Sequence, residues 1–151
     1  MRLILAALVS MEVAGCASGP AGPTLPDTLT FKLNDYVEGG GLLPLTGRLE
    51  LTIDPSGDAR SACRRDILTD MERTGSLSRE QLVELVARVQ AWTSKGGDVA
   101  PAGNNHGLLV YGKKKAGWAK DAVLPPELQE LVKFLLTIPT TLQVVTRRKG
   151  F

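Results

Sequence analysis

Histidine, cysteine and aromatic residues are scarce in this chain of 151 residues, and each shortage narrows what it can do. One histidine and two cysteines are a poor start for a zinc site, which needs three or four ligands. Aromatic residues make up 5% of the chain, so the core must consist mainly of leucine and valine. The formal net charge is +2, which argues against a dedicated nucleic-acid binder, because such proteins carry a strongly basic face.

Motifs for catalysis are lacking as well. His106 lies in an expected loop, and no serine near it has the pattern of a nucleophile. Gly107–Lys113 nearly matches a phosphate-binding loop, but Lys114 stands where the motif needs serine or threonine, and the residues between alternate as in a strand. Asp66 and Asp70 have no calcium-loop spacing around them. We therefore expect no enzyme activity, metal, cofactor or nucleotide.

The N-terminus carries a short apolar segment that ends in a cysteine. Arg2 supplies a positive charge, Leu3 to Val9 is an unbroken apolar run, and Val13-Ala14-Gly15-Cys16 follows. The run is too short for a membrane span, which needs ~20 apolar residues. This segment resembles a bacterial lipoprotein signal peptide with its lipobox. The resemblance implies that residues 1–15 are removed and that Cys16 is acylated.

The lipobox predicts that the lipid on Cys16 attaches the protein to a membrane of the bacterial cell envelope. The next residue is Ala17, whereas an aspartate there retains enterobacterial lipoproteins in the inner membrane, so the resemblance favours the outer membrane. Two alternatives are a plain secretory signal, which would give a secreted protein, and a wrongly chosen start codon. Glu12 is a charge that a processed signal rarely carries so close to its cleavage site.

The remainder of the chain is long enough for one domain. Residues 16–27 combine the lipidated cysteine with a linker rich in proline and glycine, and residues 28–151 form the predicted domain. Cys63 alternates with small residues on one side of an expected strand, so we predict a buried structural thiol. A reactive thiol, activated by Arg64 and Arg65, is the alternative.

Hydrophobic periodicity predicts both strands and helices. Strands are expected near 29–33, 49–53, 59–65, 108–111, 118–123 and 142–146, while 66–73 is ambiguous between strand and helical turn. A turn at 54–57 and a hairpin connection at 113–117 join neighbouring strands. Ser78 and Gln81 form the capping box of a first helix, and Pro125-Pro126 opens a second.

Two helical stripes complete this pattern. The predicted apolar faces are Leu82, Leu85, Val86, Val89 and Trp92 in the first helix, and Leu128, Leu131, Val132, Leu135 and Leu136 in the second. We predict an α+β fold in which an antiparallel sheet of about five or six strands has both helices packed on one face, in the order βββα-ββα-β.

This order of features resembles the emfourin-type domains, which inhibit thermolysin-like metalloproteases. The motifs that carry the resemblance are Gly39–Gly41 in an early loop, Asp54–Gly57 after the second strand, the capped helix from Leu77 and the Pro125–Leu136 segment. Where that family has Ser-Gly-Gly-Phe, this chain has Glu38-Gly39-Gly40-Gly41-Leu42. The resemblance covers about residues 28–138 and implies the same α+β fold.

Two surfaces are candidates for partner binding. The first is the loop Glu38, Gly39, Gly40, Gly41, Leu42 and Leu43, where glycines permit close backbone approach and the leucines suit an interface. The second is Lys113, Lys114 and Lys115, which would contact anionic lipid or an acidic partner. We expect a non-enzymatic binding module with an envelope protein as its partner. The alternative is an emfourin-like inhibitor of a secreted thermolysin-type metalloprotease.

Overall fold

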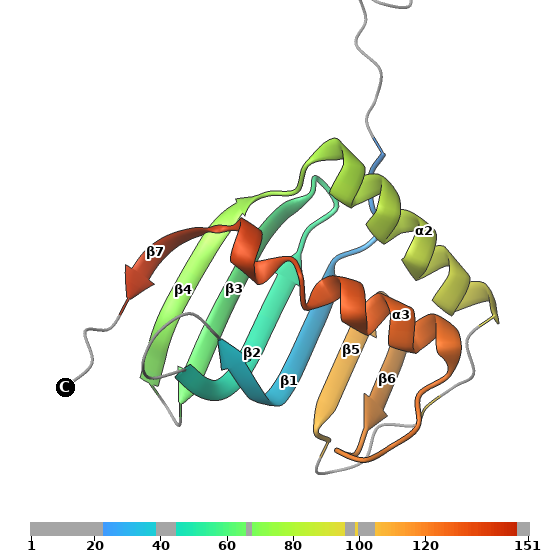
Figure 1. Ribbon diagram of the computed structural model, residues 1–151. Coiled ribbons are helices and arrows are strands. Elements are labelled where there is room, and N and C mark those ends of the chain that lie inside the picture. The colour runs from blue at the N-terminus through green and yellow to red at the C-terminus, as the bar shows by residue number, and fades with distance from the viewer. Residues whose placement is uncertain (1–22, 39–44, 66–67, 96–98, 100–104, 148–151) are drawn as a thin grey trace, which may run out of the picture.

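The protein is built from one antiparallel sheet with two helices packed on a single face (Figure 1). The computed structural model describes residues 23–38, 45–65, 68–95, 99 and 105–147. Within these ranges the helices are α2 (Arg79–Lys95) and α3 (Pro126–Leu135), and a 3-10 turn, η1 (Pro139–Thr141), follows α3. The predicted α+β class, with its antiparallel sheet and both helices on one face, is confirmed.

The described residues contain seven strands. They are β1 (Leu29–Glu38), β2 (Leu45–Ile53), β3 (Asp58–Arg65), β4 (Leu68–Ser76), β5 (Gly107–Tyr111), β6 (Lys114–Trp118) and β7 (Gln143–Arg147). Their order across the sheet is β6-β5-β1-β2-β3-β4-β7, and all neighbours are antiparallel. Strands β1 to β4 form a meander. The segment containing α2 then returns the chain to the β1 side for the β5–β6 hairpin, and the segment containing α3 leads to β7 beside β4.

Two strand predictions need correction, and the first of them raises the predicted five or six strands to seven among the described residues. The ambiguous segment after β3 is strand β4, in which Met71 is the buried apolar residue among the side chains that the structure describes. The expected strand at 118–123 is wrong: the second hairpin strand is β6. The turn falls at Gly112, whose φ of +57° permits a tight reversal, and Ala116 and Trp118 supply the buried side chains.

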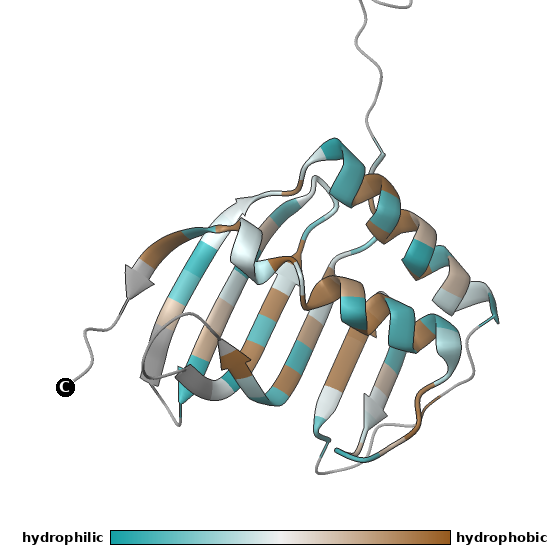
Figure 2. Cartoon of the chain, viewed as in Figure 1, coloured by the Kyte–Doolittle hydropathy of each residue, from teal (hydrophilic) through white to brown (hydrophobic). Residues whose placement is uncertain are grey.

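Alternation along the strands divides the sheet into two faces. Figure 2 shows this division as apolar and polar stripes along β1 and β2. One face lies under the helices and forms the core. Its largest fully buried side chains, with those of the helices that cover it, are Trp92, Phe31, Leu25, Leu29, Leu49, Leu51, Ile53, Leu85, Leu109, Leu128, Leu131 and Leu135. Cys63 is also buried there, between strands β2 and β4, which confirms its predicted placement.

Both helices have the predicted faces and starts. In α2 the backbone N–H of Gln81 donates to Ser78 Oγ at 3.1 Å, and the N–H of Ser78 donates to Gln81 Oε1 at 2.8 Å, which is a reciprocal capping box. Leu82, Leu85, Val89 and Trp92 are buried, as are Leu128, Leu131 and Leu135 in α3. Pro126 occupies the first position of α3, where its missing N–H costs no helical hydrogen bond.

The described residues just before residue 28, within the expected linker, contact the domain. Leu25 is 2% exposed and belongs to the core, and its N–H donates to the carbonyl of Pro55 at 3.3 Å. The last part of the expected linker is therefore packed against the turn between β2 and β3. We call this end of the sheet, which also holds the β5–β6 turn, the tether end, and the opposite end the far end.

Candidate functional site

The uncovered face of the sheet, here called the open face, carries the polar members of each strand. The strand register places them in rows across the sheet. One row runs Lys115, Val110, Thr30, Thr52, Arg60 and Thr74, and the next runs Gly117, Leu108, Lys32, Glu50, Ala62 and Glu72. The same alternation that buries Phe31 and Leu51 presents their neighbours to solvent on this face.

Ion pairs connect the strands on the open face. Glu50 forms ion pairs with Arg48 and with Arg64, each at 3.2 Å, and Glu72 forms an ion pair with Arg60 at 3.0 Å. These side chains are partly exposed, so each pair contributes at most about 1 kcal/mol to the free energy of unfolding. Their main effect is to hold long cationic side chains in fixed positions on a flat surface.

Strand β1 is interrupted by a bulge at the far end. The register with β2 shifts between Leu33 and Tyr36, and Asp35 takes a φ of +56°. An aspartate tolerates this left-handed conformation better than most residues. The bulge directs the carboxylate of Asp35 away from the ladder, where its Oδ2 lies 3.3 Å from Lys120 Nζ and 3.8 Å from His106 Nδ1.

Backbone hydrogen bonds tie this bulge to the β5–β6 hairpin. The N–H of Asn34 donates to the carbonyl of His106 at 2.8 Å, and the N–H of His106 donates to the carbonyl of Trp118 at 2.8 Å. The side-chain amide of Asn34 donates to the carbonyl of Asn105 at 3.0 Å. Three segments that are distant in sequence are therefore fixed relative to one another.

A small pocket opens on the open face beside this bulge; we call it the bulge pocket. Its volume is about 200 Å³. The residues that line it are Lys32, Asn34, Arg48, Asn105, His106 and Leu108. Three of these can carry positive charge and two are amides, and no carboxylate lines the cavity. The bulge pocket can therefore accept a negatively charged group.

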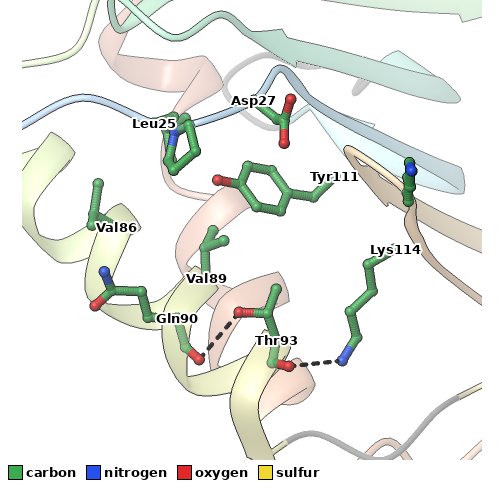
Figure 3. Close-up of a pocket in the computed structure, with 10 residues that line it drawn as sticks. Leu25, Asp27, Val86, Val89, Gln90, Thr93, Tyr111 and Lys114 are labelled. Carbon is green, nitrogen blue, oxygen red and sulfur yellow. Dashed lines mark hydrogen bonds between the residues drawn. The ribbon is translucent and has the colours of Figure 1, made fainter.

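A second pocket, of about 370 Å³, lies at the tether end between α2 and the β5–β6 turn (Figure 3). Leu25, Val86 and Val89 form an apolar wall, and Tyr111 faces them. Burial raises the pKa of the Tyr111 hydroxyl, and the nearby charge of Asp27 acts in the same direction. This tether-end pocket combines apolar walls with a polar rim, and the chain that leads from Cys16 enters the domain beside it.

The three consecutive lysines are separated by the structure. Lys114 folds back onto α2, where its Nζ donates to the carbonyl of Trp92 at 3.1 Å and lies 5.1 Å from the Trp92 ring centroid. A cation at the C-terminal end of a helix is favourable because of the helix dipole. Lys113 is exposed at the rim of the tether-end pocket, whereas Lys115 lies on the open face. Contact of these lysines with lipid or an acidic partner stays a prediction.

Other predicted site residues lie outside the described part of the chain. Residues 39–43 and Cys16 fall there, and of Glu38 the structure gives only the backbone, as the last residue of β1. The inhibitor alternative therefore stays a prediction. Within the described ranges, no group of three or more His, Cys, Asp or Glu side chains could hold a metal ion, and neither helix has the length and apolar character needed to span a membrane.

No partner for His106 could be predicted from the sequence, and the structure places Asp35 beside it. The two residues are 71 positions apart, and the contact depends on the β1 bulge and on the pairing of β1 with β5. A signal that could have suggested the bulge is the Asn34-Asp35 pair at the end of an alternating run, because both residues tolerate positive φ.

The fold and these pockets define an α+β domain with a partly ion-paired sheet face. Comparison of the chain with protein-family models, with curated proteins and with solved structures found no match in any of the three.

Proposed function

We propose that this protein is a lipid-anchored, non-enzymatic binding module of the bacterial cell envelope. The observation that carries the proposal is the position at which the chain from Cys16 joins the domain. Leu25 is buried at the tether end and donates its N–H to Pro55, so the first described residues join the domain beside the start of β1 at this end (Figure 1). Acylation of Cys16 would attach the domain to a membrane through this end and leave the far end for a partner.

The short connection supports this arrangement. Residues 17–24 are eight residues, and a fully extended chain of this length spans at most roughly 29 Å. The domain would therefore stay within about its own diameter of the membrane surface. Strand β1 advances ~17 Å between Leu29 and Asn34, at ~3.4 Å per residue, so the bulge pocket lies well away from the point of attachment.

Charge at the tether end is compatible with a membrane surface. Lys113 is exposed beside the tether-end pocket, and a lysine near an anionic membrane contributes about 1 kcal/mol. Such a contribution is too weak to hold the domain without the acyl chains. It would orient the tether end towards the lipid once the lipid on Cys16 has brought the domain there.

The test is fractionation of cells that express the full chain, with Cys16→Ser as the variant. We expect the unmodified chain in the membrane fraction and the variant in the soluble fraction, because a serine cannot be acylated through sulfur. Cys63→Ala is the matched control: it also removes a cysteine, but from the core, and it should stay in the membrane fraction. Equal membrane retention of Cys16→Ser would contradict the lipid anchor.

Separating the two membranes of the envelope refines the same test. Ala17 at the position after the acylated cysteine favours the outer membrane. We therefore expect the chain to sediment with outer-membrane markers, and Ala17→Asp to move it to the inner membrane. Sedimentation of the unmodified chain with inner-membrane markers would contradict this part of the proposal.

A further inference from the structure

The bulge pocket gathers cationic side chains from three neighbouring strands or their ends. Lys32 comes from β1, Arg48 from β2 and His106 from the segment that precedes β5. The register explains the grouping, since Lys32 pairs with Glu50 on one side and with Leu108 on the other. Lys32, Arg48 and His106 are thereby held at the far end of the open face, around a common cavity.

We infer that the bulge pocket binds a single oxyanion of the size of a phosphate group. This inference rests on the proposed function, because it names the chemistry of the ligand that the anchored module would bind. Arginine and lysine are the side chains that proteins most often use for phosphate, and charge-assisted hydrogen bonds to them are about twice as strong as neutral ones. The amides of Asn34 and Asn105 line the same cavity and supply neutral hydrogen-bonding groups.

The balance of charge around the pocket favours an anion. Four cationic side chains stand against two carboxylates, which leaves a local charge of +2 without counting His106. The cations are Lys32, Arg48, Arg64 and Lys120, and the carboxylates are Glu50 and Asp35. Both carboxylates are ion-paired, whereas Lys32 has neither a hydrogen bond nor an ion pair with the described residues. Lys32 is therefore available to a ligand.

The site is also preorganised. Asn34 and His106 are joined by a backbone hydrogen bond of 2.8 Å, and His106 is joined to Trp118 by another of 2.8 Å. Asp35 lies on the Nδ1 side of the His106 ring, which leaves Nε2 as the ring nitrogen that can face a ligand. Binding in such a rigid frame loses less conformational freedom than binding by mobile side chains.

The size of the cavity sets the size of the ligand. A volume of about 200 Å³ is below the ~300–1,000 Å³ that is usual for pockets that enclose a whole small molecule. The bulge pocket would hold one charged group, with the rest of the ligand outside it. Its place at the far end favours a phosphate that is dissolved or is carried by an envelope polymer, over a lipid headgroup of the membrane that holds the anchor.

The experiment is a calorimetric titration of inorganic phosphate into the acylated full chain, solubilised in an uncharged maltoside detergent at constant ionic strength. We expect saturable binding at one site. Lys32→Gln and Arg48→Gln should each weaken it roughly tenfold, the effect of losing one hydrogen bond to a charged group. Lys115→Gln is the matched control, since Lys115 lies on the open face outside the pocket, and its affinity should change less than about twofold, as expected for a screened, distant charge.

A variant that is expected to bind phosphate more tightly excludes damage to the fold as the explanation for weaker binding by the other variants. Asp35→Asn keeps a residue that tolerates positive φ and removes a carboxylate beside His106. We expect this variant to bind phosphate at least about twofold more tightly, because a nearby negative charge is lost. The inference is overturned if phosphate does not bind saturably, or if Lys115→Gln weakens binding as much as Arg48→Gln does.

Competition distinguishes the sources of the phosphate group. If the ligand is a lipid headgroup, vesicles containing phosphatidylglycerol would displace inorganic phosphate. If the ligand is a free or polymer-borne phosphate, soluble glycerol phosphate would displace inorganic phosphate and the vesicles would not. We expect the second result. Anchoring is tested separately: phosphate binding by a chain that fails to fractionate with membranes would contradict the proposed function and leave the site standing. Membrane attachment without phosphate binding would contradict the phosphate site and leave the proposed function standing.

Discussion

The two faces of the sheet come from the same strands but differ in what their side chains do. On the helix-covered face, Phe31, Leu51 and Leu109 are fully buried. On the open face, their neighbours Lys32, Glu50 and Leu108 lie beside one another, and the lysine reaches solvent. The residues that stabilise the fold and those available to a ligand therefore alternate along the chain.

The difference between the two faces indicates that separate sets of residues stabilise the fold and bind a ligand. Core side chains gain free energy by leaving water, at about 25 cal/mol per Å² of apolar surface, and each fits a tightly packed space. Open-face side chains form exposed ion pairs that contribute little. Substitutions on the open face should change binding and leave the fold, whereas substitutions on the covered face should do the opposite.

The largest expected effect, and so the strongest test of the difference between the two faces, comes from removing one large core side chain. Phe31→Ala deletes a buried ring whose centroid lies 6.4 Å from that of Trp118, and we expect the free energy of unfolding to fall by about 3–5 kcal/mol. Its neighbour on the open face, Thr30→Ala, should cost less than about 1 kcal/mol. Urea unfolding measures both. Similar losses for the two variants would contradict the division into a core face and an open face.

The next largest effect is expected at the β5–β6 hairpin. A Cβ atom at Gly107 would overlap the ring of Trp118, so Gly107→Ala should force the indole to move and cost about 1–3 kcal/mol. At Gly75 the nearest atom to a Cβ is the end of the Leu142 side chain, at 3.2 Å, which can shift. Gly75→Ala is therefore the control, and thermal unfolding should rank it as the milder change. The reverse ranking would show that Trp118 does not pack as described.

A smaller loss is expected at the start of α2, where the chain passes from the sheet onto the covered face. Ser78→Ala removes the hydroxyl that caps Gln81 N–H and should lower stability by about 1 kcal/mol. Ser94→Ala, near the exposed end of the same helix, removes a hydroxyl that bonds the carbonyl of Gln90 within the helix and should have little effect. Chemical denaturation would refute the role of the cap if Ser78→Ala were as stable as the unmodified chain.

The smallest expected effect is on the pH dependence of stability, and it arises from Asp54 in the turn between β2 and β3. A hydrogen bond from the Ser56 hydroxyl, helped by backbone N–H groups of Asp58, Ser56 and Gly57, holds the pKa of Asp54 below its usual 3.8. A carboxyl whose pKa is lowered by folding stabilises the protein above pH 3.8, and this contribution is lost as the pH falls through the lower value in the folded state. Asp54→Asn should therefore be less stable at neutral pH and converge with the unmodified chain in acid. Parallel pH profiles of unfolding would show that Asp54 makes no such contribution.

Local signals in the sequence predicted much of the covered face. Alternation located β1, β2, β3 and β7, and the capping box placed the start of α2 within a residue. Strand β4 was ambiguous, and Met71 is its buried apolar residue among the side chains that the structure describes. Strand β6 was displaced because a tight turn at Gly112 replaced the expected lysine-rich connection. Leu25 lies within the expected linker, but it is buried, and its N–H bonds the carbonyl of the distant Pro55, a contact that local patterns do not reveal.

The bulge pocket could not be predicted from the sequence, for a physical reason. The residues that line it include Lys32 and His106, which lie 74 positions apart, and they meet through the strand order β5-β1-β2. That order depends on the chain crossing the sheet by way of α2, which periodicity does not reveal. The predicted glycine loop at 39–43 lies outside the described residues, so its role as a partner surface stays a prediction.

The division between the two faces is tested most directly by NMR, following the backbone amides of the full chain in maltoside detergent while inorganic phosphate is added. The account predicts shifts concentrated at Lys32, Asn34, Arg48 and His106, with the amides of α2 and the tether-end pocket unchanged. Shifts centred on Lys113 and Lys114, or an equal response over both faces, would contradict the account.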